Sequence, residues 1–307
     1  MENRRWLTLL SNVIPSASYL SPPALSFVNS SFSPVCFLFD NGSLRAASTQ
    51  NLRGVATVLA EELRVDVRAV SLLHSSAVDP ASLDGKKAEL LEPALQTWLT
   101  EQPTGAAIAL PFFFGPSAAL TEYVPERLAA LRGKFPQANI RLARPLVDPA
   151  EKETEIADAL ADAVKETMTA RSWTRPKVIV VDHGSPQPAV AAVRDHLGKQ
   201  VAQRLGALVE TVGVASMERR PGPEYAFSDP LLADRLRTPP FDRGNVVLAM
   251  QFLSPGRHAG PEGDVATIVR AAEAERPGLC IAMTDTLGTR PGVIRVLARR
   301  YRECLGQ

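Results

Sequence analysis

The sequence predicts an α/β protein made of two similar doubly wound domains, each with a mainly four-stranded parallel sheet. Short apolar runs rich in β-branched residues alternate with longer segments of helical period, as expected for βα units whose sheet is covered on both faces. Matching runs recur at an offset of about 140 residues, which indicates one internal duplication rather than a solenoid. Two short loops that follow apolar runs also recur at this offset.

Eight apolar runs are predicted as strands, four in each copy of the duplicated unit. Longer segments of helical period separate the runs, and in two of these segments apolar residues at three-to-four spacing form one stripe. Two such segments, 154–168 and 190–205, are predicted as helices. The predicted strands are 35–39, 67–73, 106–114 and 140–146 in the first copy, and 177–182, 209–217, 245–253 and 279–286 in the second.

A polar stretch that ends in proline separates the two copies. It runs over 170–176 and directly precedes a predicted strand, so we place the domain boundary there. The prediction is an N-terminal domain at 34–171 and a C-terminal domain at 176–307.

Residues 1–33 are predicted as an extension of uncertain structure. The start Arg4-Arg5-Trp6 resembles a twin-arginine export signal, but Ser11 and Pro15 interrupt the apolar stretch that follows, so we do not expect export. No run approaches the roughly 20 apolar residues that a membrane helix needs.

Composition excludes several classes of partner. The 34 basic and 33 acidic side chains nearly cancel, so no global field attracts nucleic acid or an anionic membrane, and we expect neither as a partner. The three cysteines are too few and too scattered for a disulfide framework or a Cys-x-x-Cys site, which favours a reducing cytoplasm. Cys36 and Cys280 lie in predicted strands, where we expect them to be small buried hydrophobes.

The repeated loops carry the chemistry, and only the second copy has histidines in them. His183 lies in Val-Val-Asp-His-Gly-Ser and His258 in Ser-Pro-Gly-Arg-His, each after a predicted strand, whereas Asn41 and Ala118 occupy the matching positions of the first copy. Because ligands of parallel sheets bind beyond the carboxyl ends of the strands, both imidazoles are expected at the binding edge. Glu218, after the second strand of the same copy, adds a carboxylate.

Two imidazoles and one carboxylate with open positions suit a divalent ion such as cobalt, iron, nickel or zinc. Imidazole also accepts protons near neutral pH, because its ordinary pKa is about 6.5. The residues therefore predict a site that binds a metal and takes up protons.

These motifs resemble the class II tetrapyrrole chelatases, specifically the sirohydrochlorin cobaltochelatase and ferrochelatase group. Members carry a His-Gly-Ser loop after strand one, an acidic residue after strand two, and a Pro-x-Phe-Leu-x-x-Gly-x-His stretch after strand three. The resemblance covers residues 33–304 and is strongest in the second copy. It differs at two positions, because Asp182 precedes the first histidine where relatives have a small residue and Gln251 replaces a proline.

The resemblance implies a lyase that inserts Co²⁺ or Fe²⁺ into sirohydrochlorin or a related tetrapyrrole, in cobalamin or sirohaem biosynthesis. It implies that His183, Glu218 and His258 face the metal and that the two histidines accept the pyrrole protons. No cofactor is expected beyond the substrate ion, and the protein is expected to be a monomer or a homodimer. The first copy, with Asn41 and Ala118, is expected to form a wall of the pocket rather than a second centre.

A substrate with many carboxylates requires arginines that make bidentate contacts. The predicted substrate-binding residues are Arg257, beside the second histidine, with Arg45, Arg219 and Ser185 in the other strand-end loops. His74, which ends the second strand of the first copy, is a weaker candidate for the cleft.

Two acidic groups have structural alternatives. Glu262 and Asp264 stand at the start of a predicted helix, where the dipole favours carboxylates. We interpret them as helix-start residues, with a relay that hands metal to the site as the alternative. For Asp182 we favour a structural or partly exposed role, with support of the histidine tautomer as the alternative.

Two other functions remain open. One is a degenerate relative that binds a tetrapyrrole or a metal without inserting it. The other is a hydrolase that uses His183 and Ser185, which is disfavoured because the sequence has no Gly-x-Ser-x-Gly elbow. A Walker phosphate loop and a dinucleotide glycine motif are also missing from the sequence.

Overall fold

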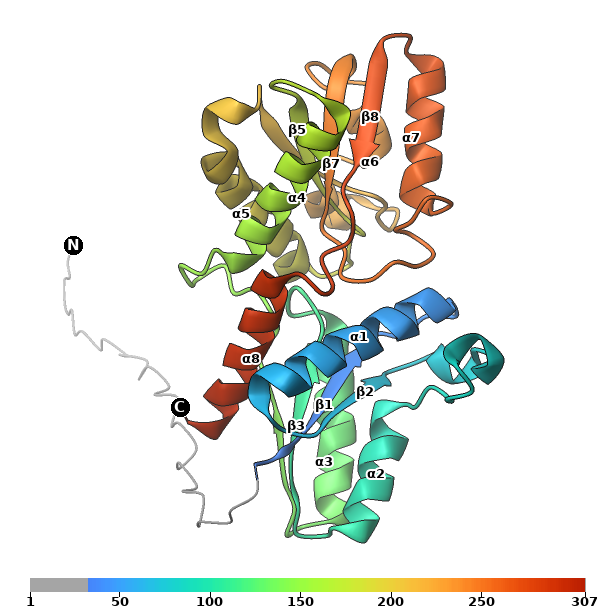
Figure 1. The fold of residues 1–307 in the computed structure, drawn as a ribbon, viewed down its shortest axis with the longest axis vertical. Helices are drawn as coiled ribbons and strands as arrows, with labels where there is room; N and C mark the ends of the chain where they lie inside the picture. Colours follow the sequence, from blue (N-terminus) through green and yellow to red (C-terminus); the bar gives the residue numbers. More distant parts are fainter. Residues whose placement is uncertain (1–32, 307) are drawn as a thin grey trace, which may run out of the picture. The chain divides into compact units, whose positions relative to one another are not determined.

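Two four-stranded sheets, each all parallel, organise the computed structural model, which describes residues 33–306. The predicted extension, including its export-like start, lies outside the described residues apart from Ser33. Pro34–Gln307 forms one structural unit. The two sheets have the same strand order, with the first strand of each copy in second place, which confirms the predicted fold class (Figure 1).

The eight predicted strands all form, most of them a few residues shorter than their apolar runs. In the order of the sheets, they are β2 (Val67–Ser71), β1 (Val35–Asp40), β3 (Ala106–Pro111) and β4 (Asn139–Leu142), then β6 (Val212–Ser216), β5 (Lys177–Asp182), β7 (Gly244–Met250) and β8 (Leu279–Met283).

The helices follow the strands as the periodicity predicts. They are α1 (Ala46–Leu63), α2 (Leu91–Glu101), α3 (Val124–Lys134), α4 (Glu155–Arg171), α5 (Pro188–Leu205), α6 (Leu232–Arg235), α7 (Asp264–Glu275) and α8 (Pro291–Leu305). Within residues 33–306, no helix combines the length and the apolar character needed to cross a membrane.

Both faces of each sheet are buried, because successive strand residues point to opposite sides. In β1, Phe37 and Phe39 pack with apolar residues of α2 and α3, whereas Cys36 and Leu38 pack in a second cluster. That second cluster also contains the inner faces of β5 and β7 and apolar residues of α1, α4, α5 and α8. The two copies of the duplicated unit therefore share one continuous core, and α6 and α7 cover the remaining face of the C-terminal sheet.

Two helices cross between the copies. Helix α4, which lies within the segment predicted as the N-terminal domain, packs on α5 and β7 of the C-terminal sheet. Helix α8, the last element, packs on α1 and β3 of the N-terminal sheet, and Figure 1 shows it beside α1. The predicted boundary at 171–176 stays a prediction, and the terms N-terminal and C-terminal copy below denote the sequence segments 34–171 and 176–307.

A buried arginine on α8 holds the segment that leads into α4. Arg300 on α8 is 1% exposed and donates to the carbonyl oxygens of Pro145 (2.9 Å) and Leu146 (3.2 Å), just before α4. Its guanidinium also pairs with Glu153 (2.7 Å) and Glu303 (2.9 Å). Because these bonds saturate most of its donors, the segment that enters α4 is tied to the last helix.

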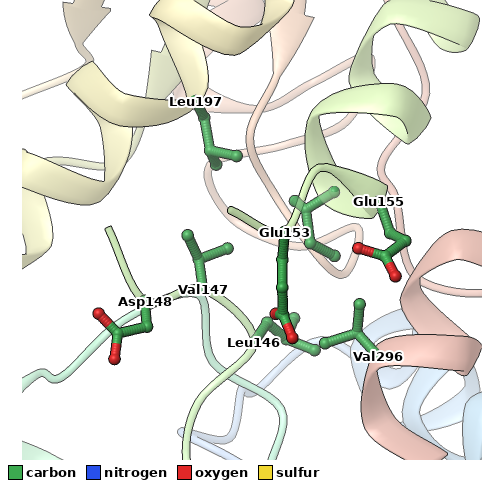
Figure 2. A pocket seen from close by; sticks show the side chains of 8 residues that line it. Leu146, Val147, Asp148, Glu153, Glu155, Leu197 and Val296 are labelled. Atoms are coloured by element: carbon green, nitrogen blue, oxygen red, sulfur yellow. The ribbon is translucent and has the colours of Figure 1, made fainter. Parts of the chain in front are cut away.

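A small cavity of about 10 Å³ lies beside this crossing (Figure 2). Figure 2 shows that the side chains around it come from the segment before α4, from the first turn of α4, from α5 and from α8. This volume is at the lower limit for one water molecule, so it is a packing defect and not a ligand site. The lining residues are Leu146, Val147, Asp148, Glu153, Glu155, Ile156, Leu197 and Val296, none of them a predicted site residue.

Candidate active site

The two histidines meet at the carboxyl edge of the C-terminal sheet. Strands β5 and β7 are parallel neighbours, so the loops that follow them emerge side by side. The imidazole centroids of His183 and His258 are 4.4 Å apart, with the rings inclined at 64°. The pairing expected from the sequence is therefore present, although the residues are 75 positions apart in the chain.

A glycine allows the first histidine loop to turn against the neighbouring strand end. Gly184 has φ +91°, and a Cβ there would overlap the carbonyl oxygen of Glu218. The loop is further held by the Glu218 amide, which donates to the His183 carbonyl at 3.2 Å. This close approach brings the acidic residue beside the imidazole.

His183 is arranged to hold a positive charge at Nε2. Its Nδ1 lies 2.9 Å from the Gly184 carbonyl, which only accepts, so Nδ1 carries the proton. Its Nε2 lies 3.3 Å from Oε1 of Glu218. The Nε2 lone pair of His183 and the carboxylate oxygen of Glu218 repel each other unless a proton or a cation binds between them. His183 and Glu218 together can therefore accept a proton or a cation.

His258 is held by a carboxylate. Its Nδ1 lies 2.7 Å from Oδ2 of Asp264, and because a carboxylate only accepts, Nδ1 donates and the Nε2 lone pair is left free. Asp264 is also the first residue of α7, as the sequence interpretation proposed. That interpretation was incomplete, because the same side chain fixes the histidine tautomer.

The donor set is open. Within the described part of the chain, no group of three or more His, Cys, Asp or Glu side chains is arranged to hold a metal ion. His183, Glu218 and His258 lie at one edge but do not form a closed cage, and their joint role as metal ligands stays a prediction. The side chains of these residues are 46%, 61% and 31% exposed, so a large partner can reach them.

A cleft of about 1070 Å³ adjoins the histidines and receives residues from both copies. Protein sites for small molecules usually measure about 300–1,000 Å³, so this cleft suits a large ligand. The C-terminal copy supplies the two histidines and the segment 251–257, and the N-terminal copy supplies an aromatic wall at 112–114. His74 also lines the cleft, as the sequence suggested.

The predicted substrate-binding residues divide into two groups. Arg45 and Arg257 line the cleft from opposite copies and are both exposed. Arg219 and Ser185 do not line it: the Arg219 guanidinium pairs with Asp229 at 2.8 Å, and the Ser185 hydroxyl accepts from the Gln187 amide at 3.1 Å. The structure thus brings Arg45 and Arg257 to the cleft, where Arg257 also lies 3.6 Å from the Asp264 carboxylate, and it holds Arg219 and Ser185 in contacts outside the cleft.

Asp182 is buried and structural rather than partly exposed. Only 5% of it is accessible, and its carboxylate accepts from the Ser216 hydroxyl at 2.7 Å. The guanidinium of Arg194, 1% exposed, donates to the same hydroxyl at 2.6 Å. Burial raises the pKa of Asp182, while the Ser216 hydrogen bond and the Arg194 charge oppose that rise. The network anchors the strand end from which His183 projects.

The N-terminal copy contributes support as well as a wall. Asn41, in the place of His183, lines the cleft, whereas Ala118 does not. Asn51 on α1 donates from Nδ2 to the Leu253 carbonyl (3.1 Å) and to the Ser254 hydroxyl (2.8 Å), in the segment that leads to the second histidine. Sequence reasoning did not identify this contact, because nothing in a helix sequence indicates which distant loop it meets.

The C-terminal part of the chain matches a family model. The model is described as CbiX, and the match covers residues 177–304. This match includes both histidine loops and confirms the family resemblance that the motifs indicated. No curated protein sequence matches the chain significantly.

Solved structures extend the likeness beyond residues 177–304 to both copies. SirB from Bacillus subtilis with Fe³⁺ is 14% identical, with a TM-score of 0.61 over 88% of this chain and 95% of that one. The sirohydrochlorin chelatase SirB from Bacillus subtilis subspecies spizizenii in complex with cobalt is 14% identical, with a TM-score of 0.62 over 89% and 96%. CbiX, the terminal enzyme of siroheme biosynthesis in denitrifying bacteria, is 16% identical, with a TM-score of 0.59 over 88% and 99%. At such identities the likeness shows the shared fold.

Proposed function

We propose that this protein is a metallochelatase that inserts Co²⁺ or Fe²⁺ into sirohydrochlorin or a closely related tetrapyrrole. The observation that carries the proposal is the pair of imidazoles, His183 and His258, each with a carboxylate partner, at the edge of a cleft of macrocycle size. The CbiX match over the same residues and the chelatase fold support it.

Metal insertion requires two protons to leave the pyrrole nitrogens as the ion enters. Neutral imidazoles are suited to accept these protons near neutral pH. Glu218 is positioned to stabilise the positive charge that develops on His183, and Asp264 does the same for His258. An open donor set also fits a transferred ion, because a closed cage of protein ligands would hold the metal against the macrocycle.

The cleft supplies contacts for the rest of the substrate. Arg45 and Arg257 line the cleft from different copies, and in this proposal their guanidinium groups pair with peripheral carboxylates of the substrate. The aromatic wall at 112–114 and Phe252 offer apolar surface to the macrocycle. The N-terminal copy thus acts as a wall and the C-terminal copy carries the reactive groups. We also propose a cytoplasmic location, consistent with the three cysteines being unpaired.

Anaerobic incubation with sirohydrochlorin and Co²⁺ or Fe²⁺, followed by absorbance, tests the function. We expect insertion to be faster than the spontaneous reaction at the same metal concentration. A rate equal to the spontaneous one would reject catalysis. Tight binding of sirohydrochlorin without acceleration would instead support a binding protein.

A further inference from the structure

The segment that leads from β7 to His258 is held by the other copy. It lines the cleft and contains no helix or strand over residues 251–260. The side-chain nitrogen of Asn51, on α1, donates to the Leu253 carbonyl at 3.1 Å and to the Ser254 hydroxyl at 2.8 Å. Because an amide NH₂ group has two hydrogens, one side chain serves both acceptors. This contact lies four residues before His258, and Asn51 itself does not line the cleft.

The N-terminal copy satisfies the equivalent carbonyl within its own backbone. There the Phe114 carbonyl stands in the place of the Leu253 carbonyl, and it accepts from the Val147 amide at 2.9 Å. The preceding carbonyl accepts from a leucine amide in both copies, at 2.9 and 2.8 Å, which establishes the equivalence. Among residues 33–306, no backbone amide donates to the Leu253 carbonyl. The segment before His258 therefore depends on Asn51 for a bond that the other copy makes by itself.

A glycine makes room for this side chain. Gly288 stands in the place of Val147, and a Cβ there would lie 2.6 Å and 2.7 Å from the oxygen and the nitrogen of the Asn51 amide. In the matching contact of the N-terminal copy, the place of Asn51 is taken by Val193, since each is the sixth residue of its helix. A Cβ at Gly115 would lie 2.8 Å from the Val193 side chain. The contact is thus polar only where it holds a histidine segment.

Helix α1 also carries groups that face the substrate cleft. Arg45 directly precedes the helix and Ser48 lies in its first turn, and both line the cleft. Asn51 follows Ser48 by three residues, so the two side chains lie on the same side of the helix. One helix therefore connects the cleft wall of the N-terminal copy to the segment before His258.

Resting on the proposed function, we propose that Asn51 is a positioning residue for metal insertion. It holds the segment before His258 at a fixed distance from α1, so that this imidazole reaches a macrocycle bound against the N-terminal wall. Asp264 sets the tautomer of the same ring, whereas Asn51 sets where the ring stands. The histidine-free copy then contributes to the reaction by placing a reactive group of the other copy.

Kinetics of Asn51→Leu test the proposal, because leucine is of similar size and has no hydrogen-bonding group. Misplacement of a reactive group lowers turnover, and Asn51 does not line the cleft. We therefore expect kcat for cobalt insertion to fall about tenfold, with KM for sirohydrochlorin within about twofold of the wild type. Asn51→Asp, nearly the same in shape, should show the same loss, because a carboxylate cannot donate to the Leu253 carbonyl.

Gln50→Met is the matched control on the same helix. The Gln50 side-chain nitrogen also donates to a backbone carbonyl, that of Ser82 at 3.1 Å, but this bond stays within the N-terminal copy. We expect the variant to keep the kcat and KM of the wild type.

The imidazole signals of the ligand-free protein give a readout that does not require turnover. The chain has four histidines, so substitution of each one assigns its NMR signals. We expect the His258 signals to shift in Asn51→Leu and to stay in place in Gln50→Met. His196, which lies on α5, is the internal reference and should not shift in either variant.

Several results would overturn the inference. These are an unchanged kcat in Asn51→Leu, a change confined to KM, an equal loss in Gln50→Met, and His258 signals that do not move. Failure of both Asn51 variants to fold, while Gln50→Met folds, would show a role in the fold alone. If the wild type does not accelerate insertion, the proposed function itself fails, and the imidazole signals still decide whether Asn51 positions His258.

Discussion

The first strand of each copy ends at an aspartate that accepts a hydrogen bond from a serine, but the residues around this bond differ between the copies. In the N-terminal copy the Ser71 hydroxyl donates to Asp40 at 2.6 Å, and in the C-terminal copy Ser216 donates to Asp182 at 2.7 Å. Only the second pair is joined by a buried guanidinium, that of Arg194.

The equivalent residue in the N-terminal copy is apolar. Helices α1 and α5 have the same length, and Leu52 stands at the seventh residue of α1 as Arg194 stands at the seventh of α5. Burial then raises the pKa of Asp40 to about 6, with no arginine among the groups that oppose it. Both copies thus keep the aspartate–serine hydrogen bond at the end of the first strand. Only the copy that carries the histidines adds a buried arginine to it.

The largest effect is expected from removing the buried guanidinium. Arg194→Met leaves Asp182 as an uncompensated buried charge, which costs about 3–5 kcal/mol of unfolding free energy. The matched change Leu52→Met keeps the volume and is expected to cost less than about 1.5 kcal/mol. Chemical denaturation measures the unfolding free energies of the two variants. Similar losses would show that the buried arginine does not distinguish the C-terminal copy energetically.

The buried Asp40 carboxyl, which has no charged partner among residues 33–306, predicts a pH dependence of stability. The pKa of Asp40 is about 6 in the folded protein against an ordinary 3.8, so the folded state binds more protons between about pH 4 and pH 6. The unfolding free energy contributed by this group falls as the pH rises through that window, by up to about 3 kcal/mol.

Asp40→Asn should therefore stabilise the protein above pH 6 and have little effect at pH 4. The amide oxygen still accepts from Ser71, so the strand-end hydrogen bond is kept. In the C-terminal copy the pKa of Asp182 is also raised by burial, but the Arg194 charge opposes that rise, so Asp182→Asn should give a smaller gain. Melting curves of both variants from pH 4 to pH 8 measure the two gains, and a gain from Asp182→Asn as large as that from Asp40→Asn would contradict the contrast between the copies.

Asp264 offers a test of the histidine support. Removing a carboxylate that holds a metal-binding imidazole typically weakens metal affinity or turnover about 10–100-fold. We expect this for Asp264→Ala in Co²⁺ titrations and in the insertion assay, together with loss of the Nδ1–H tautomer of His258 in nitrogen NMR spectra.

Glu262→Gln removes a carboxylate from the same helix start and is the control for the dipole. Its effect on Co²⁺ affinity should be clearly smaller, since it makes no hydrogen bond to either histidine. If the two variants weakened Co²⁺ affinity equally, Asp264 would act only as a helix-start residue and not as a support of His258.

The smallest effect concerns a strained turn that only the N-terminal copy has. His74 has φ 65° and ψ −41°, and the Ser75 amide donates to the Leu73 carbonyl at 2.7 Å, which makes a γ-turn of the strained type. His74→Gly should raise the unfolding free energy by about 1 kcal/mol, whereas His74→Ala keeps the strain and should not. Equal stabilities of these two variants would show that the turn is not strained.

The sequence was sufficient for what depends on local pattern. It predicted the strands, the parallel sheets, and the meeting of His183 and His258, because strand-end loops of neighbouring parallel strands converge. It did not predict the crossing of α4 and α8, since a loop sequence does not specify which sheet the next helix covers. Cys280 was wrongly expected to be buried, because its strand β8 lies at the sheet edge.

The site shows the same limit. Asp264 was interpreted as a helix-start residue, with a metal relay as the alternative, and its contact with His258 depends on loop geometry that the sequence does not display. Gln251 was noted only as a departure from the family motif. Its burial in the lining of the cleft depends on the fold and not on any local pattern of the sequence.

The central claim is one catalytic centre, carried by the C-terminal copy and walled by the N-terminal one. The most direct test compares the rates of cobalt insertion into sirohydrochlorin by His183→Ala and Asn41→Ala, which remove equivalent side chains of the two copies. We expect His183→Ala to lower the insertion rate about 10²–10⁴-fold and Asn41→Ala to keep a rate within about threefold of the wild type. An equal loss in the two variants would contradict the account.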